Sequence, residues 1–231
     1  MNLTNLIFGI YPYIALTTFL VGSVIRFDRE QYTWKADSSQ LFEKEQLQKG
    51  SILFHVGVLA LFMGHFAGLV TPHSWFLGLG VSDMMHQVVA ISAGAGFGSL
   101  CMMGGVILWK RRMYNSRVRA NSRFMDIFIL NWILVTLGVG LVTIPVSIYH
   151  AFNGDASVMI ALAEWVQGML LLNANPEMLT GVGFIYKLHL FLGMTVFLLF
   201  PFTRLVHVWS APFSYMWRPY QIVRTKFVKR R

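Results

Sequence analysis

Five long apolar runs, separated by shorter polar links, dominate the hydrophobic pattern of this chain. Each run has close to the roughly 20 residues that an α-helix needs to cross the hydrocarbon core of a bilayer. The runs cover residues 6–25, 52–70, 88–109, 127–148 and 184–209. This pattern predicts an all-α integral membrane protein, a single domain over residues 1–231 with five transmembrane helices.

Two apolar segments need separate interpretation. The first run is preceded by no basic residue and followed by no small-residue cleavage site, so we interpret it as a retained span rather than a signal peptide. Residues 158–172 are apolar but form a shorter segment that contains Glu164 and Gln167. A helix lying on the outer membrane surface is therefore a better interpretation of this segment than a sixth span.

The composition agrees with a membrane protein. Hydrophobic residues make up 55% of the chain and charged residues 13%, whereas a soluble domain carries about 25% charged residues. The single cysteine, Cys101, lies in the third run, which excludes an internal disulfide, a four-cysteine iron–sulfur site and a c-type haem attachment. We predict that Cys101 is a small core residue.

The positive charges are concentrated in three segments, so their placement explains the net charge of +9 without a nucleic-acid partner. They are Arg26, Arg29, Lys35, Lys44 and Lys49 in the first link, Lys110, Arg111, Arg112, Arg117, Arg119 and Arg123 in the third link, and Arg218, Arg224, Lys226, Lys229, Arg230 and Arg231 in the tail. Because basic loops stay in the cytoplasm, five spans place the N-terminus outside and the C-terminus in the cytoplasm. Tyr32 and Trp34 suit an interfacial position in the first link.

Four histidines lie inside two of the runs, His55 and His65 in the second and His189 and His207 in the fifth. An imidazole surrounded by hydrocarbon is costly, so a histidine within a span is a candidate functional residue. The 18-residue step from His189 to His207 is five helical turns, which predicts one shared face and a separation of roughly 27 Å. The ten-residue step in the second run leaves its histidines about 80° apart, which a tilted helix accommodates.

The predicted topology pairs these histidines by depth. The two spans run in opposite directions, so His55 lies level with His207 near the cytoplasm, and His65 lies level with His189 nearer the outside. Two neutral imidazoles on opposite sides of a porphyrin iron would satisfy both histidines of a pair and would fill an apolar space between helices. We therefore predict two haems that carry electrons and have no open site for substrate. For any single histidine, a hydrogen bond to a helix carbonyl or a proton-relay role is an equally good explanation.

Other polar residues near these levels carry weaker signals. Three further histidines, for which a solvated interface is the favoured interpretation, are His73, His86 and His150. Three arginines could bind a haem propionate, namely Arg204, Arg26 and Arg112. The positive-inside pattern is the simpler explanation of each.

Three stretches resemble one family. They are IYPYIALTTFLVGSVIRFDREQYTWKADSSQ, LFHVGVLALFMGHFAGLVTPH and KLHLFLGMTVFLLFPFTRLVHVWS. These stretches resemble the gamma subunit of respiratory nitrate reductase, a membrane di-haem cytochrome b, and the resemblance includes the order, spacing and flanks of all four histidines. It implies that His55 and His207 are the axial iron ligands of the inner haem b, and that His65 and His189 are those of the outer haem b.

The resemblance also implies a function in the cytoplasmic membrane of a prokaryote. Quinol would be oxidised beside the outer haem, and electrons would pass to a cytoplasmic iron–sulfur subunit and then to a molybdenum subunit that reduces nitrate. The chain itself contains no nitrate-reducing site. Its basic links and tail would dock these subunits, although topology alone also explains the charges.

The quinol contacts are where this sequence departs from the family. The family often has a lysine at the outer start of the third span, where this chain has His86 within SDMMHQ. A histidine there could accept a quinol proton near neutral pH. We expect quinol between the second and third spans, with His86, Gly64 and Asp83 as candidate contacts and with both quinol protons released outward.

Two other functions remain open at this point. A similar subunit of a nitrite-oxidising complex would carry electrons in the opposite direction. A haem-free transporter or proton channel would use the histidines as a relay, and it would show no haem absorption.

Overall fold

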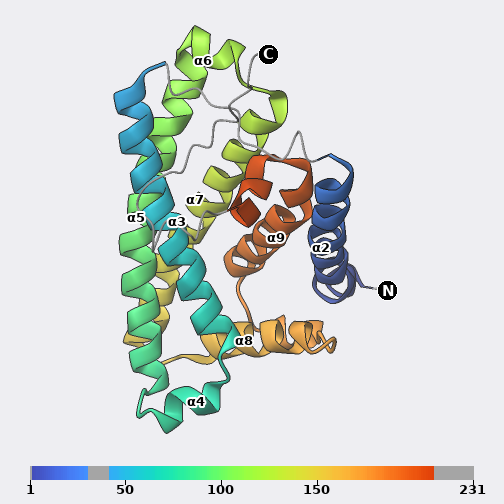
Figure 1. Ribbon diagram of the computed structural model, residues 1–231. Coiled ribbons are helices and arrows are strands. Elements are labelled where there is room, and N and C mark those ends of the chain that lie inside the picture. Colours follow the sequence, from blue (N-terminus) through green and yellow to red (C-terminus); the bar gives the residue numbers. More distant parts are fainter. Residues whose placement is uncertain (1, 31–41, 211–231) are drawn as a thin grey trace, which may run out of the picture.

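The computed structural model describes residues 2–30 and 42–210, and every regular element within these ranges is helical (Figure 1). Five helices are long and apolar enough to cross a membrane: Leu3–Arg29, Lys44–Val70, Asp83–Tyr114, Phe124–Phe152 and Phe184–Phe202. The all-α prediction is confirmed, and five helices have the length and apolar character of the predicted spans. The first four helices extend beyond the predicted apolar runs because polar terminal turns continue each helix. Tyr32, Trp34 and the basic tail lie outside the described residues.

The elements follow one another with short connections. They are α1 (Leu3–Asn5), the π-helical turn η1 (Leu6–Ile10), α2 (Tyr11–Arg29), α3 (Lys44–Val70), α4 (His73–Gly78), α5 (Asp83–Tyr114), α6 (Ser116–Ala120), α7 (Phe124–Phe152), α8 (Ser157–Leu170), the 3₁₀ turn η3 (Pro176–Leu179), α9 (Phe184–Leu199), and the 3₁₀ turns η4 (Phe200–Phe202) and η5 (Arg204–Ser210). Local sequence defines several starts. The Ser82 side chain accepts a hydrogen bond from the Met85 N–H and caps α5, and Asn115 caps α6 in the same way.

Glycines bring α3 and α5 into close contact. A Cβ on Gly57 would lie 2.6 Å from the backbone N of Cys101, and a Cβ on Gly104 would overlap the backbone of Phe54. Cys101 is 1% exposed, which confirms its prediction as a small core residue. Close backbone contact is expected where small residues line a helix interface in a membrane. The helix α3, which carries two of the candidate histidines, therefore has a rigid support.

The helix α8 lies across the bundle rather than along it (Figure 1). Its 14 residues span about 21 Å, less than the roughly 30 Å of a hydrocarbon core. The Gln167 side chain donates hydrogen bonds to the Leu69 and Thr71 carbonyls at the end of α3. The predicted surface helix is thus fastened to the end of a span.

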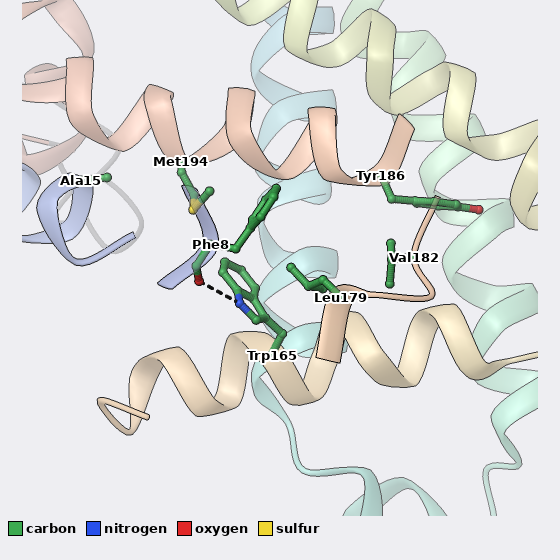
Figure 2. Close-up of a cluster of buried hydrophobic side chains, with 7 residues drawn as sticks. All are labelled: Phe8, Ala15, Trp165, Leu179, Val182, Tyr186 and Met194. Atoms are coloured by element: carbon green, nitrogen blue, oxygen red, sulfur yellow. Dashed lines mark hydrogen bonds between the residues drawn. The ribbon is translucent and has the colours of Figure 1, made fainter. Parts of the chain in front are cut away.

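A buried cluster joins α8 to the first and last spans (Figure 2). Its members are Phe8, Ala15, Trp165, Leu179, Val182, Tyr186 and Met194. The Trp165 indole N–H donates to the Phe8 carbonyl at 3.1 Å, within the π-helical turn η1. Because such a turn departs from regular α-helical bonding, an outside donor can satisfy its carbonyl.

The described parts of the basic first and third links lie at one end of the bundle. The end of α2, the start of α3 and the α5–α6–α7 connection lie together at the top of Figure 1, whereas α4 and α8 lie at the opposite end. Arg112 and Arg204 are near enough to interact electrostatically, so the end of the fifth span belongs to the basic end too. We refer to these two ends as the basic end and the α8 end.

We predict that Gly104→Ala destabilises the protein by about 1–3 kcal/mol, because the added methyl group overpacks the α3–α5 contact. Gly96→Ala on the same helix is the matched control, since its Cβ would meet no atom within 4 Å. Thermal unfolding of both variants in detergent measures the difference. Equal stability of the two variants would contradict the proposed packing role of Gly104.

Candidate functional site

The structure brings the four predicted histidines together in two pairs. The ring centroids of His55 and His207 are 6.3 Å apart, and those of His65 and His189 are 6.1 Å apart. Both pairs join α3 to the last span, one nearer the basic end and the other nearer the α8 end. The pairing by depth that the sequence suggested is therefore present in the fold.

All four imidazole rings have the same kind of hydrogen-bond partner at Nδ1. Each Nδ1 lies within hydrogen-bond distance of a backbone carbonyl: Ser51 for His55 (2.8 Å), Leu61 for His65 (2.7 Å), Thr136 for His189 (3.1 Å) and Arg204 for His207 (2.6 Å). A carbonyl only accepts hydrogen bonds, so this network assigns the proton of each neutral ring to Nδ1. Every Nε2 is left with a lone pair, the form in which histidine binds a metal.

The ring separation suits one metal ion between the two rings of a pair. With metal–nitrogen bonds of about 2 Å, two imidazoles on opposite sides of an ion have centroids about 6 Å apart. Within residues 2–30 and 42–210, no group of three or more His, Cys, Asp or Glu side chains could hold a metal. Two imidazoles supply two ligands, so a cofactor such as a porphyrin would have to supply the other ligands of an ion held by either pair.

The two sides of each pair belong to separately supported helices. The helix α3 packs along α5 and α8, whereas α9 packs against α2 and α7. His55 and His65 are exposed on α3, and His189 and His207 are partly buried. The paired rings therefore face each other from helices that do not depend on direct packing against each other.

The helix α7 positions His189 although it contributes no ring to either pair. The Thr136 carbonyl accepts the His189 hydrogen bond, and a Cβ on Gly140, one turn further along α7, would lie 2.7 Å from Cε1 of His189. Only a residue without a side chain leaves room for the ring at this position. Neither Thr136 nor Gly140 was predicted from the sequence, because one glycine in an apolar run does not reveal which ring lies opposite it.

The fifth span differs from its prediction. The continuous helix expected over residues 184–209 ends at Leu199, and two 3₁₀ turns follow, with Thr203 in extended conformation between them. Pro201 accounts for part of this break because it lacks an N–H group to continue the helix. The prediction that His189 and His207 lie five turns apart on one continuous helix was therefore wrong. Each of the two rings nevertheless lies next to its predicted partner on α3.

The predicted quinol residues lie at the α8 end but do not form one cluster. His86 stacks on Phe76 at a centroid distance of 4.2 Å, and it lines a small open pocket together with Glu164 and Gln167. Asp83 instead pairs with His73 at 3.2 Å. Gly64 does not line the pocket, and a Cβ there would meet no atom within 4 Å.

Two pocket residues were not selected from the sequence. A Cβ on Gly68 would lie 3.4 Å from Nε2 of His86, so this glycine lets the imidazole approach α3. Glu164 had been noted only as a polar residue of the surface helix. Because α8 packs against α3, Glu164 lines the same pocket as His86.

Two of the arginines considered for a haem propionate donate to backbone carbonyls. Arg26 donates from Nη1 to Pro201 and Thr203, and Arg112 donates to Asp126. The third, Arg204, supplies the carbonyl that orients His207.

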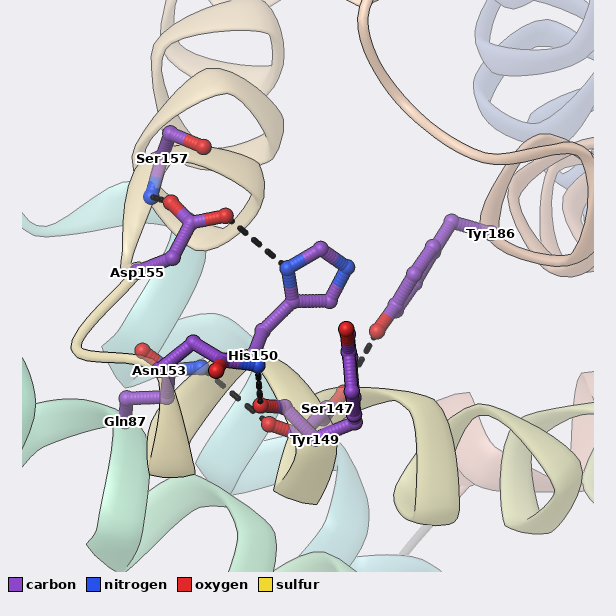
Figure 3. Close-up of polar contacts among 8 residues, drawn as sticks. All are labelled: Gln87, Ser147, Tyr149, His150, Asn153, Asp155, Ser157 and Tyr186. Atoms are coloured by element: carbon purple, nitrogen blue, oxygen red, sulfur yellow. Dashed lines mark hydrogen bonds and ion pairs between the residues drawn. The ribbon is translucent and has the colours of Figure 1, made fainter.

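A separate polar cluster lies where α7 ends (Figure 3). His150 and Asp155 form an ion pair at 2.9 Å, and Ser147 shares a 2.8 Å hydrogen bond with Tyr186. Gln87 donates to the Ser147 carbonyl. His150 is thus held by a carboxylate on the surface and contributes to neither histidine pair.

These features define a multi-pass membrane protein whose helices present paired imidazoles. The chain matches the family described as Nitrate reductase gamma subunit over residues 4–226. It is 46% identical to the respiratory nitrate reductase 1 gamma chain of Escherichia coli (strain K12), over 95% of this chain and 96% of that one. It is 35% identical to the nitrate reductase gamma chain of Bacillus subtilis (strain 168), over 96% and 98%. The chain belongs to the nitrate reductase gamma subunit family.

We predict that Asp155 stabilises the fold in a pH-dependent way. Hydrogen bonds from the Ser157 side chain and backbone, and then from His150, lower the pKa of Asp155 to about 2, from an ordinary value of 3.8. A carboxyl with a lowered pKa stabilises the folded state fully above its unfolded pKa, and this contribution is lost as the pH falls through the folded value. Asp155→Asn should therefore lower the thermal midpoint at pH 7, and the difference should vanish as the pH approaches 2.

The measurement is thermal unfolding in detergent across this pH range. Asp28→Asn, which removes a carboxylate paired with Arg29 at the basic end, is the control. A difference between Asp155→Asn and the parent chain that stays constant down to pH 2 would contradict the assignment.

Proposed function

We propose that this chain is the di-haem cytochrome b and membrane anchor of a quinol-oxidising nitrate reductase complex. It oxidises quinol near the outer face and supplies electrons to cytoplasmic iron–sulfur and molybdenum subunits, the second of which reduces nitrate. Membership of the gamma subunit family supports the assignment to such a complex. The proposal includes a cytoplasmic-membrane location in a prokaryote, with the N-terminus outside and the C-terminus in the cytoplasm.

The common orientation of the four imidazoles carries this proposal. Each Nδ1–H donates to a main-chain carbonyl, which leaves an unprotonated Nε2 on every ring. A proton relay would need rings that exchange protons on both nitrogens, whereas these rings have one nitrogen committed to a carbonyl. Fixed tautomers with a separation of about 6 Å suit axial ligation of an iron by both rings.

The roles of the residues follow from this geometry. His55 and His207 would hold the haem at the basic end, and His65 and His189 would hold the haem at the α8 end. Haem bound there would supply reversible one-electron transfer, and two histidine ligands would leave its iron no open position for substrate. The hydrogen-bonded carbonyls would keep the ligands aligned.

The α8 end is the proposed site of quinol oxidation. A quinol that gives up two electrons also releases two protons, so its site needs proton acceptors that communicate with the outside. His86 lines the pocket at this end with Glu164, and the His65 and His189 pair is the nearer of the two histidine pairs. We infer that His86 accepts a quinol proton. Gly64 and Asp83 remain candidate quinol contacts, and Asp83 pairs with His73, which lines the pocket.

The basic end is the proposed docking surface for the soluble subunits. Basic residues of the first and third links lie at this end, and by the positive-inside rule it faces the cytoplasm. Quinol oxidation at the α8 end then releases protons outside, and electrons leave from the cytoplasmic side. Moving a charge across the membrane in this way stores about 2.3 kcal/mol per 100 mV.

We expect His65→Ala and His207→Ala each to remove about one of two b-type haems, because each variant deletes one axial ligand of a different pair. A dithionite-reduced minus oxidised spectrum and the haem content per chain measure the loss. His150→Ala is the control, since His150 belongs to neither pair, and it should retain both haems. A chain that stays colourless after reconstitution with excess haem would contradict the proposal and favour the haem-free relay.

We expect His86→Ala to slow quinol oxidation by the intact complex about 100-fold, within the range contributed by a general base. His86→Lys should recover part of the rate, because a lysine can also contact a quinol oxygen. Nitrate reduction from a soluble artificial reductant and the haem spectrum should both remain at the parent level.

Met85→Ala, which changes the exposed neighbour of His86 on α5, is the control for this experiment. It should keep the parent rate of quinol oxidation. If His86→Ala oxidises quinol as fast as Met85→Ala does, His86 is not the proton acceptor.

A further inference from the structure

The position of His207 is not determined by the helix that precedes it. The helix α9 ends at Leu199, and Thr203 is extended, with φ −123° and ψ −179°, before the 3₁₀ turn that carries His207 begins. A chain that leaves helical geometry between two ligands needs another element to define the place of the second one. That element is α2.

One stripe of α2 contacts the break directly. Phe19, Gly22 and Arg26 occupy positions i, i+3 and i+7 and so share a face of the helix. The Phe19 ring lies 4.8 Å from the Phe200 ring and 5.4 Å from the Trp209 ring, between centroids. We call Phe19, Gly22 and Arg26 the α2 stripe.

Gly22 provides room for the proline of the break. A Cβ on Gly22 would lie 2.9 Å from Cγ and 3.0 Å from Cβ of Pro201, which is too close for any residue larger than glycine without movement. Pro201 is buried, so its ring cannot easily move away. The break in the last span is therefore seated against α2.

Arg26 satisfies the carbonyls that the break exposes. Its Nη1 donates to the Pro201 carbonyl at 2.6 Å and to the Thr203 carbonyl at 2.8 Å. The Leu205 N–H, which could close a helical turn here, instead donates to Oγ1 of Thr203. In an apolar surrounding, carbonyls without donors are costly, so the guanidinium stabilises this irregular backbone.

The same contacts lead to the histidine ring. Thr203 is 2% exposed, and its neighbour Arg204 supplies the carbonyl that accepts the His207 Nδ1–H at 2.6 Å. One peptide unit thus separates a carbonyl held by Arg26 from the carbonyl that orients His207. Movement of the first carbonyl would turn or shift the second.

We propose that Arg26 is a positioning residue for His207: by donating to the Pro201 and Thr203 carbonyls, it holds the broken span so that His207 faces His55. This inference rests on the proposed function, in which the His55–His207 pair binds the inner haem. It gives Arg26 a role as a backbone hydrogen-bond donor, distinct from pairing with a haem propionate.

The test uses the assembled complex with the full-length chain. Arg26→Ala should lower the inner haem content by at least about half, or shift the reduction potential and low-spin spectrum of that haem, because residues that orient metal ligands affect binding about 10–100-fold. The outer haem, bound by His65 and His189, should remain at the parent level. A general loss of stability would instead reduce both haems together.

Two further substitutions separate the donor role from a charge role. Arg26→Gln keeps an N–H donor without the charge, and it should retain more inner haem than Arg26→Ala. If Arg26→Gln behaves like Arg26→Ala while Arg26→Lys restores the haem, the charge matters and the positioning role is wrong. Gly22→Ala keeps Arg26 but displaces Pro201, so it should shift the same haem in folded protein.

Two reference variants keep the outcomes distinct. Val24→Ala changes an exposed residue of the same helix, α2, and should leave both haems unchanged. His207→Ala shows the effect of losing the ligand itself. If His207→Ala keeps both haems, the proposed function fails. If His207→Ala loses one haem while Arg26→Ala and Gly22→Ala match the parent, only the positioning role fails.

Discussion

The hydrogen bond from each histidine Nδ1–H to a main-chain carbonyl is the interaction on which the candidate site depends. It selects one tautomer and directs each ring, yet the carbonyl comes from a different source on the two sides. His55 and His65 bond to carbonyls four residues earlier in α3 itself. His189 uses a carbonyl of α7, and His207 uses a carbonyl of its own 3₁₀ turn. The orientation of His55 and His65 is therefore determined by local helical geometry. The orientation of His189 depends on packing against α7, and that of His207 depends on the position of its 3₁₀ turn.

The helices that carry the paired histidines and the helices that position them are therefore different. The helix α3 carries two rings whose partners are local, and α5 supports it through glycines that allow backbone contact. The opposing rings need helices that carry no paired ring themselves. Gly140 of α7 leaves room for His189, and Gly22 with Arg26 of α2 seats the break before His207. The helices α2 and α7, which carry no paired histidine, thus determine the positions of His189 and His207.

The two ends of the bundle differ in ways that suit the proposed electron path. At one end, α8 and the short helix α4 close over the ends of α3 and α5, and His86 and Glu164 line a pocket there. At the other end lie the start of α3 and the α5–α6–α7 connection, whose sequences are basic, and Arg112 is close enough to Arg204 of the last span to interact electrostatically. The histidine pairs lie between these ends at two levels. Proton release and electron delivery would then occur on opposite sides of the membrane, which is the condition for storing energy as a potential.

The sequence by itself determined the number of long apolar helices, the shortness of the helix within residues 158–172, the buried role of Cys101 and the pairing of the four histidines. These properties depend on run length, on the cost of polar groups in hydrocarbon and on the alternating direction of successive spans, all of which can be read along the chain. Only the tertiary structure decided that the last helix breaks after Leu199, that Gly140 makes room for His189, that Arg26 serves the broken backbone and that Glu164 shares a pocket with His86. Each of these depends on which atom of another helix lies opposite, and hydrophobic periodicity contains no record of that neighbour.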